Sequence, residues 1–324
     1  MDTWSLIQSS VQLYAGIAAL FANCILLLLI LTKSPKNLGA YKFLMIYICL
    51  FQIGYAILDI LLHADITTKD SCWIVALNSQ KTILPHGTLY YFDLLYCCSF
   101  AISLANFGVH FIFRYLVVKG EKEWTSPKTI VFWQSISLTY GAIWTLLCHV
   151  FLNRSKTADN FLQKEVIINT NQSLSDIAYL GFCFYKDPDE HGVQEINWWS
   201  VTGTLSFSSL LSFSSVIMFV FGTKCYLIIR NMANFTTFSA KFREIQSQLF
   251  YALVFQTLIP FIMMHIPCGL VYICAIIGGA PRVFGRILTI TVAVFPALDP
   301  LPNIFIIKDY RLAVFGMMNE LEKL

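Results

Sequence analysis

Seven long apolar stretches constrain the fold of this chain more than any other feature. A helix that crosses a bilayer needs about 20 predominantly apolar residues, and each stretch is long enough. Together they carry only three formal charges, Asp59, Asp93 and Asp299. The stretches are residues 11–31, 43–62, 89–113, 129–151, 200–223, 247–278 and 287–307. We therefore predict an all-α membrane protein in which residues 1–324 form a single seven-helix transmembrane domain.

The composition excludes a water-soluble globule. Only 13% of the residues are charged and 57% are hydrophobic, whereas soluble domains carry about 25% charged residues. Period-two alternation is absent from the apolar stretches, which argues against a membrane β-barrel. The formal net charge of +3 is too small to indicate nucleic-acid binding.

Positive charge is unevenly shared between the two sets of connecting segments. The segments after the first, third, fifth and seventh stretches hold 14 Lys and Arg residues, and the opposite set holds 8. Basic residues accumulate on the cytoplasmic side of membrane proteins. The N-terminus and loop 152–199 are therefore expected outside the cell, and tail 308–324 inside.

Glycosylation sequons offer a test of this orientation. Asn153 and Asn171 each begin an Asn-X-Ser sequon in the predicted extracellular loop. Asn234 begins a third sequon on the predicted cytoplasmic side, where it would stay unmodified. We expect glycan at Asn153 or Asn171 only.

Cys72 and Cys183 are the only cysteines in the predicted outer loops. An oxidising compartment permits a disulfide between them, and two free thiols are the alternative. The other eight cysteines lie in or beside apolar stretches, as small packed thiols do.

Charged groups inside a membrane are costly and often functional. Asp93 shares one helical face with Tyr90 and Cys97, which indicates either an acid in a ligand cavity or one that reaches the lipid headgroups. For Asp59 we expect the headgroup position. His265 and Met263 lie between Pro260 and Pro267, two prolines that can kink the sixth helix.

From these residues we predict a ligand site in the outer half of the bundle. Its candidate binding residues are Tyr90, Asp93, Cys97, Met263 and His265. The candidate apolar walls are Tyr90, Phe207, Phe213, Met263 and Val292, which favour a small and largely neutral ligand.

The seventh stretch contains three prolines within seven residues, so a regular helix cannot continue through it. Asp299 stands at this break beside Pro300, and Asn23 is its candidate partner because Asn in lipid seeks hydrogen bonds between helices. At the inner end of the third stretch, Arg114 either reaches the headgroups or pairs with Glu244.

The tail has Tyr310, Val314, Met317, Leu321 and Leu324 on one stripe at helical spacing. This pattern predicts a short amphipathic helix at the inner membrane interface. Catalytic motifs and metal-ligand patterns are not evident in the sequence, so neither an enzyme nor a cofactor is expected.

Seven spans, an outside N-terminus, a short second inner loop and an amphipathic tail together resemble a G-protein-coupled receptor. Narrower matches occur at residues 31–45, the run from Gly108 to Tyr115, residues 246–260, and Leu298-Asp299-Pro300-Leu301 with Asp309-Tyr310-Arg311. These stretches resemble nematode chemoreceptors of the Str superfamily. Among its classes, str and srj fit best.

The resemblance implies a chemosensory, olfactory receptor for a small ligand such as an odorant or a pheromone-like compound. It implies coupling to a heterotrimeric G protein in the plasma membrane, in the cilium of a sensory neuron. Arg114 and Tyr115 correspond to the signalling arginine motif, and Asp299 and Pro300 to the bend in helix seven. His110 precedes this motif, and no acid adjoins Arg114.

Other classes of function stay open at this point. A ligand-gated channel of inverted topology would have a cytoplasmic N-terminus, against the charge distribution. A transporter would be expected to show paired repeats. A partner that serves only trafficking or heteromer formation cannot be distinguished by sequence from a ligand-binding receptor.

Overall fold

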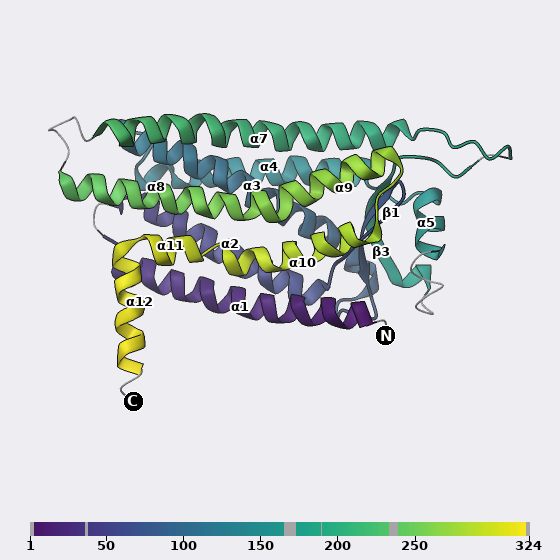
Figure 1. Cartoon of the computed structure of the whole chain (residues 1–324), viewed down its shortest axis with the longest axis horizontal. Helices are drawn as coiled ribbons and strands as arrows, with labels where there is room; N and C mark the ends of the chain where they lie inside the picture. Colours follow the sequence, from purple (N-terminus) through teal and green to yellow (C-terminus); the bar gives the residue numbers. More distant parts are fainter. Residues whose placement is uncertain (1–2, 36–37, 165–172, 189, 233–238, 322–324) are drawn as a thin grey trace.

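The computed structural model describes residues 3–35, 38–164, 173–188, 190–232 and 239–321. Seven helices in these ranges are long and apolar enough to cross a membrane, which confirms the predicted fold class. They lie side by side along the long axis of the molecule (Figure 1). The first four are α1 (Thr3–Lys33), α2 (Tyr41–Leu62), α3 (Leu89–Lys119) and α4 (Ile130–Phe151).

Of the last three spanning helices, the one without proline is continuous and the two that contain prolines are interrupted. The fifth, α7 (Trp198–Asn231), is continuous. The sixth consists of α8 (Ala240–Pro260), a π-helical turn (Phe261–His265) and α9 (Ile266–Ile277). The seventh consists of α10 (Arg282–Leu298) and α11 (Leu301–Ile306), with the break at Asp299 and Pro300. The irregular backbone predicted for both helices is therefore present.

Several helices continue beyond the predicted apolar stretches. α3 extends to Lys119, so Arg114 lies within the helix and not at its end. Gly120 ends this helix with a positive φ of 88°, and its N–H donates to the carbonyls of Leu116 and Val117. Polar residues keep the same backbone hydrogen bonds as apolar ones, so the apolar length underestimates the helix.

A three-stranded antiparallel sheet lies at one end of the bundle, which we call the sheet end (Figure 1). Its strands are β1 (Asp65–Lys69), β2 (Cys72–Asn78) and β3 (Ile177–Cys183), in that order. The sequence did not predict them, because β2 and β3 are buried on both faces and show no alternation. A short helix, α5 (Lys156–Leu162), packs on the sheet beside β3.

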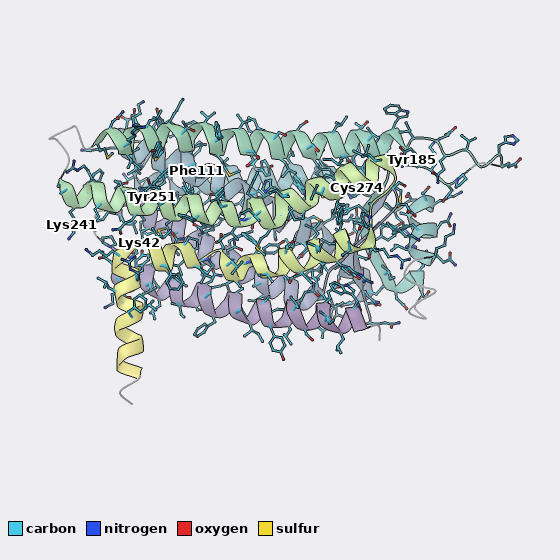
Figure 2. The ribbon with its side chains drawn as sticks, in the orientation of Figure 1. Lys42, Phe111, Tyr185, Lys241, Tyr251 and Cys274 are labelled. Atoms are coloured by element: carbon cyan, nitrogen blue, oxygen red, sulfur yellow. A yellow bond between two sulfur atoms is a disulfide. The ribbon has the colours of Figure 1, made fainter. Side chains whose placement is uncertain are left out.

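The opposite end, which we call the tail end, carries α12 (Lys308–Leu321), which runs across the bundle axis (Figure 1). Tyr310 of α12 is fully buried, and its hydroxyl lies 2.8 Å from that of Ser34. Burial raises the pKa of Tyr310 to about 12, so the phenol stays protonated. Lys42 and Lys241 lie at this end, whereas Tyr185 and Cys274 lie at the sheet end (Figure 2).

Two residues of the predicted tail stripe can be placed. Tyr310 is buried, and Val314 is half-buried against the same apolar cluster. The side chains of Met317 and Leu321, all of Leu324, and the sequon residues Asn171 and Asn234 lie outside the described residues.

Candidate functional site: a cavity beneath the sheet

A cavity of about 50 Å³ lies in the half of the bundle nearest the sheet, and we call it the sheet-end cavity. Five spanning helices and two strands contribute to its walls, so a molecule inside it would touch most of the bundle. Its volume is about a third of the roughly 150 Å³ apolar cavity known to hold benzene. The lining residues are Ile66, Trp73, Val75, Tyr96, Cys97, Phe100, Trp144, Cys148, Leu152, Phe207, Cys268, Tyr272, Leu288 and Val292.

Aromatic rings connect the walls of the sheet-end cavity. The ring of Trp144 lies 5.9 Å from that of Phe100 and 4.6 Å from that of Phe207, measured between centroids. The ring of Trp73 lies 5.8 Å from that of Tyr272. These contacts join α4 to both α3 and α7, and β2 to α9. A change in the contents of the cavity therefore acts on several helices at once.

Strand β1 is fastened to α10 by hydrogen bonds at the wall of the cavity. The backbone N–H of Ile66 donates to the hydroxyl of Thr289 at 2.9 Å. The hydroxyl of Thr68 donates to the carbonyl of Pro281 at 2.8 Å. Gly285 allows this approach, because a Cβ there would lie 2.4 Å from the carbonyl oxygen of Ile66.

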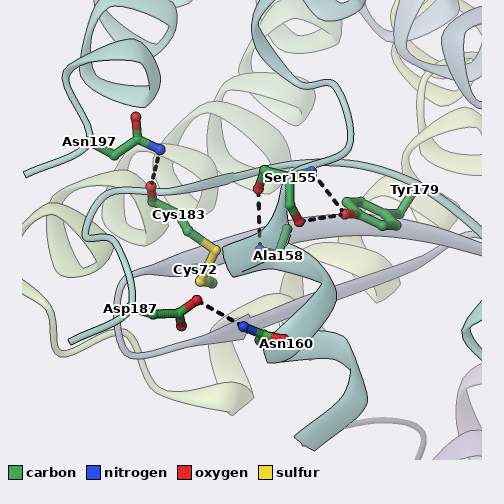
Figure 3. The surroundings of a disulfide bond; sticks show 8 residues. All are labelled: Cys72, Ser155, Ala158, Asn160, Tyr179, Cys183, Asp187 and Asn197. Carbon is green, nitrogen blue, oxygen red and sulfur yellow. Dashed lines mark hydrogen bonds between the residues drawn. A yellow bond between two sulfur atoms is a disulfide. The ribbon is translucent and has the colours of Figure 1, made fainter. Parts of the chain in front are cut away.

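A disulfide between Cys72 and Cys183 joins β2 to β3 (Figure 3). Asn197, which caps the start of α7, donates a hydrogen bond to the carbonyl of Cys183 at 3.0 Å. The hydroxyl of Tyr179 in β3 interacts with the backbone of Ser155 at the start of α5. The sheet is thus tied to the loop after α4 and to the start of α7.

Two buried acids lie near the cavity. Asp93 is fully buried, and among the described residues neither carboxyl oxygen has a hydrogen-bond partner. It precedes the cavity residue Cys97 by one helical turn on the same face of α3. Asp59 is also buried and accepts a hydrogen bond from the hydroxyl of Tyr96, another cavity residue, at 3.0 Å. The expected headgroup position of Asp59 is therefore wrong, because a tyrosine across the helix interface offers it a donor.

At the tail end, Arg114 is fully buried and does not reach the headgroups. Its guanidinium donates to the backbone carbonyl and to the side-chain oxygen of Gln246 in α8. The side chain lies over the ring of Tyr41, whose hydroxyl is 3.1 Å from Nδ1 of His110. Tyr115 instead packs against Phe221 of α7.

Glu244 does not pair with Arg114 in this structure. It is exposed, and its carboxylate lies 3.7 Å from the ammonium of Lys308. Residues two apart on a helix are rotated by about 200° from one another. When Gln246 faces Arg114, Glu244 must point away from it.

Asp299 belongs to a buried amide network between the sixth and seventh helices. Gln256 donates to its carboxylate at 2.8 Å, and Asn303 donates to the side-chain oxygen of Gln256 at 3.0 Å. Asn23 instead donates to the carbonyl of Pro296 at 2.9 Å. Pro300 has no N–H to give to that carbonyl four residues earlier, so Asn23 satisfies the group that proline frees. The expected bond from Asn23 to Asp299 is therefore not formed.

A family model described as "Serpentine type 7TM GPCR chemoreceptor Str" matches residues 8–315. The chain belongs to this Str family. It is 31% identical to "G-protein coupled receptor str-217" of Caenorhabditis elegans, over 96% of this chain and 89% of the relative. It is 29% identical to "Serpentine receptor class r-10" of Caenorhabditis briggsae over 93% and 87%, and 23% identical to "Serpentine receptor class J-38" of C. elegans over 89% and 86%.

Membership in the Str family confirms the predicted resemblance and makes the chain a multi-pass chemoreceptor of the G-protein-coupled type. The relatives carry class names str, r and J. The match to the family model extends over nearly the whole chain, so the family assignment does not depend on a single segment.

Three of the predicted cavity residues of this Str-family chain line the sheet-end cavity: Cys97, Phe207 and Val292. The others do not. Tyr90 faces α4, where its hydroxyl lies 2.8 Å from Nδ1 of His149. Phe213 is 62% exposed on the outer face of α7. Its expected position in the cavity is wrong because periodicity alone does not give the rotation of a helix.

His265 and Met263 lie in the π-helical turn and outside the cavity lining. Nδ1 of His265 is 3.4 Å from the carbonyl of Pro260, and its ring packs on Phe261. The sequence reasoning also missed Trp73, Trp144 and Cys148. Each tryptophan was an available signal, but nothing in the local sequence pattern shows that Trp73 of β2 and Trp144 of α4 line the same cavity.

Proposed function

We propose that this chain is a chemosensory receptor that binds a small, volatile or weakly polar molecule in the sheet-end cavity and signals to a heterotrimeric G protein at its tail end. The observation that carries the proposal is the cavity itself, with apolar and aromatic walls from five helices. The chain's similarity to str-217, which is named a G-protein coupled receptor, supports the proposed coupling.

The proposed mechanism is a shift between two arrangements of the bundle. A ligand moves such an equilibrium only when it binds one arrangement more tightly than the other. A molecule in the cavity touches α9 and α10, and both continue toward the tail end through breaks near Pro260 and Pro300. The Asp299 network and the Arg114–Gln246 contact lie along those continuations.

In the proposed orientation the sheet end and the N-terminus face outward and α12 faces the cytoplasm, with the receptor in a sensory cilium. The distribution of basic residues favours this orientation. Arg114, Tyr115 and His110 would then lie on the G-protein side, as would Asp299 and Pro300.

The test fills the cavity without changing its polarity. Val292→Phe adds a ring at the cavity wall, and Val216→Phe makes the same change at a position of α7 that is 59% exposed. Cells that express each variant are exposed to a panel of small volatile compounds, and G-protein activation and surface delivery are measured together. Loss of response in Val292→Phe alone, at equal delivery, is the expected result.

Equal responses of the two variants to every active compound would refute a ligand site in this cavity. A current that persists without any G protein would favour the channel alternative.

A further inference from the structure

Groups that accept a hydrogen bond strongly are scarce in the sheet-end cavity. Of the described residues that line it, none is Asp, Glu, His, Asn, Gln, Ser or Thr. The hydroxyl of Tyr96 donates to Asp59, and the hydroxyl of Tyr272 interacts with the thiol of Cys268. Tryptophan N–H groups only donate. The O–H or N–H of an alcohol, an acid or an amine would therefore lose its bond to water without an equal replacement.

Sulfur, by contrast, is concentrated at this cavity. Cys97 of α3, Cys148 of α4 and Cys268 of α9 all line it, which is three of the eight free cysteines. The thiols of Cys97 and Cys148 interact directly with each other. An S–H group is a weak donor and sulfur is a weak acceptor. A further S–H group can join such a contact, because it gives up only weak bonds to water when it leaves solvent.

The remaining walls also suit a polarisable atom. Sulfur makes favourable contacts with aromatic rings, often at the ring edge. Six rings line the cavity, so a sulfur atom inside it would lie among aromatic carbons wherever it does not touch a thiol. These rings belong to Trp73, Tyr96, Phe100, Trp144, Phe207 and Tyr272.

The size of the cavity limits the ligand to a very small molecule. Its volume of about 50 Å³ is about a third of the roughly 150 Å³ that holds benzene. By this comparison it holds a molecule of about two non-hydrogen atoms. So few atoms limit the dissociation constant to roughly the millimolar range.

We propose that the ligand of this receptor is a volatile thiol of one or two non-hydrogen atoms, whose sulfur contacts the thiols of Cys97 and Cys148 and the aromatic walls. Methanethiol and hydrogen sulfide share this chemistry. The inference rests on the proposed function and adds the chemical class of the ligand. Binding is non-covalent, so no bond forms between the ligand and a cysteine and no oxidant is needed.

The experiment compares three probes of two non-hydrogen atoms each: methanethiol, methanol and ethane. They are applied in oxygen-free buffer at millimolar concentrations. The melting temperature of the detergent-solubilised receptor reports binding, and G-protein activation in cells reports response. 2-Mercaptoethanol, a larger and more polar thiol, reports any effect of reducing the Cys72–Cys183 bond.

The variants separate the sulfur contacts from general packing. Cys97→Ala combined with Cys148→Ala removes the two interacting thiols. Cys225→Ala makes the same change at a buried cysteine of α7 that is not among the lining residues. Surface delivery serves as the folding control for each.

We expect methanethiol to raise the melting temperature and to activate the receptor, ethane to act more weakly, and methanol to have no effect. The double variant should need about two- to tenfold more methanethiol, the worth of one sulfur contact, whereas Cys225→Ala should match wild type. If the double variant is not delivered, the comparison of methanethiol with methanol on wild type decides alone. Equal effects of methanethiol and methanol, of methanethiol and 2-mercaptoethanol, or on the double variant and Cys225→Ala would overturn the assignment.

Failure of this inference differs from failure of the proposed function. If other volatiles activate the receptor, Val292→Phe blocks them and methanethiol is inactive, the cavity is a ligand site and only the thiol class is wrong. If Val292→Phe and Val216→Phe respond alike to every active compound, the cavity itself is refuted.

Discussion

The guanidinium carbon of Arg114 lies 4.9 Å from the centre of the Tyr41 ring, so a charge of α3 rests on an aromatic face of α2. The hydroxyl of the same tyrosine meets His110, one turn earlier in α3. Gln246 of α8 accepts hydrogen bonds from the guanidinium through its backbone carbonyl and its side-chain oxygen. Three helices are thereby held together at the tail end by polar contacts that lipid cannot replace.

Removing the side-chain oxygen of Gln246 should destabilise the receptor. Gln246→Ala leaves the buried guanidinium with fewer acceptors, which costs about 1–3 kcal/mol. Glu244→Gln alters an exposed side chain two residues away and should change stability by less than about 0.5 kcal/mol. Denaturation of the two purified variants in detergent compares them, and an equal effect would contradict the role given to Gln246.

Asp299→Asn should impair the response more than surface delivery. The amide keeps an oxygen for Gln256 but removes the ionisable carboxyl group at the break between α10 and α11. Asp309→Asn, at an exposed position in the first turn of α12, serves as the matched control. Flow cytometry of a surface tag, beside the G-protein readout, separates the two effects. Parallel loss of delivery and response would indicate a purely structural role.

Gly285→Ala should displace β1 from α10. The added Cβ would meet the backbone of Ile66 at 2.4 Å and of Thr68 at 2.9 Å, and neither is the end of a flexible side chain. We expect a loss of about 1–3 kcal/mol. Gly54→Ala, where a Cβ meets nothing within 4 Å, should be neutral or slightly stabilising. Melting temperatures decide between them, and a neutral Gly285→Ala would show that the contact is loose.

Glycosylation reports the orientation of the bundle. Asn153 lies exposed just after α4, at the sheet end. We expect the wild-type protein to give a glycosidase-sensitive band. Asn153→Gln, Asn171→Gln or the two together should remove this band, whereas Asn234→Gln should leave it unchanged. A glycan attached only at Asn234 would invert the bundle and favour the channel reading.

The seven helices and their breaks could be predicted because they follow from requirements local to the sequence. Span length is fixed by bilayer thickness, and Pro260 and Pro300 each lack the N–H that a continuous helix would need at their positions. The sheet could not be predicted in this way, because the alternation that signals a strand disappears when both faces are buried.

The partners of polar residues were equally hidden. The rotation of α8 about its own axis decides whether Arg114 contacts Glu244 or Gln246, and the sequence is compatible with either rotation. Asn23 was correctly expected to hydrogen-bond across helices, but the acceptor is a backbone carbonyl freed by Pro300. The type of a buried polar residue shows that it needs a hydrogen-bond partner. Which residue serves as that partner is decided by the packing of the helices.

The contacts that hold β1 and β2 over the cavity should slow the release of a bound molecule. Hydrogen bonds to α10 hold one strand, and the Cys72–Cys183 bond holds the other. A molecule that leaves through this wall must wait for such contacts to open, and rates gated in this way fall below those of free diffusion. The receptor would then remain occupied after the stimulus has gone, and the hold of the sheet would set how quickly a cell can register a second pulse.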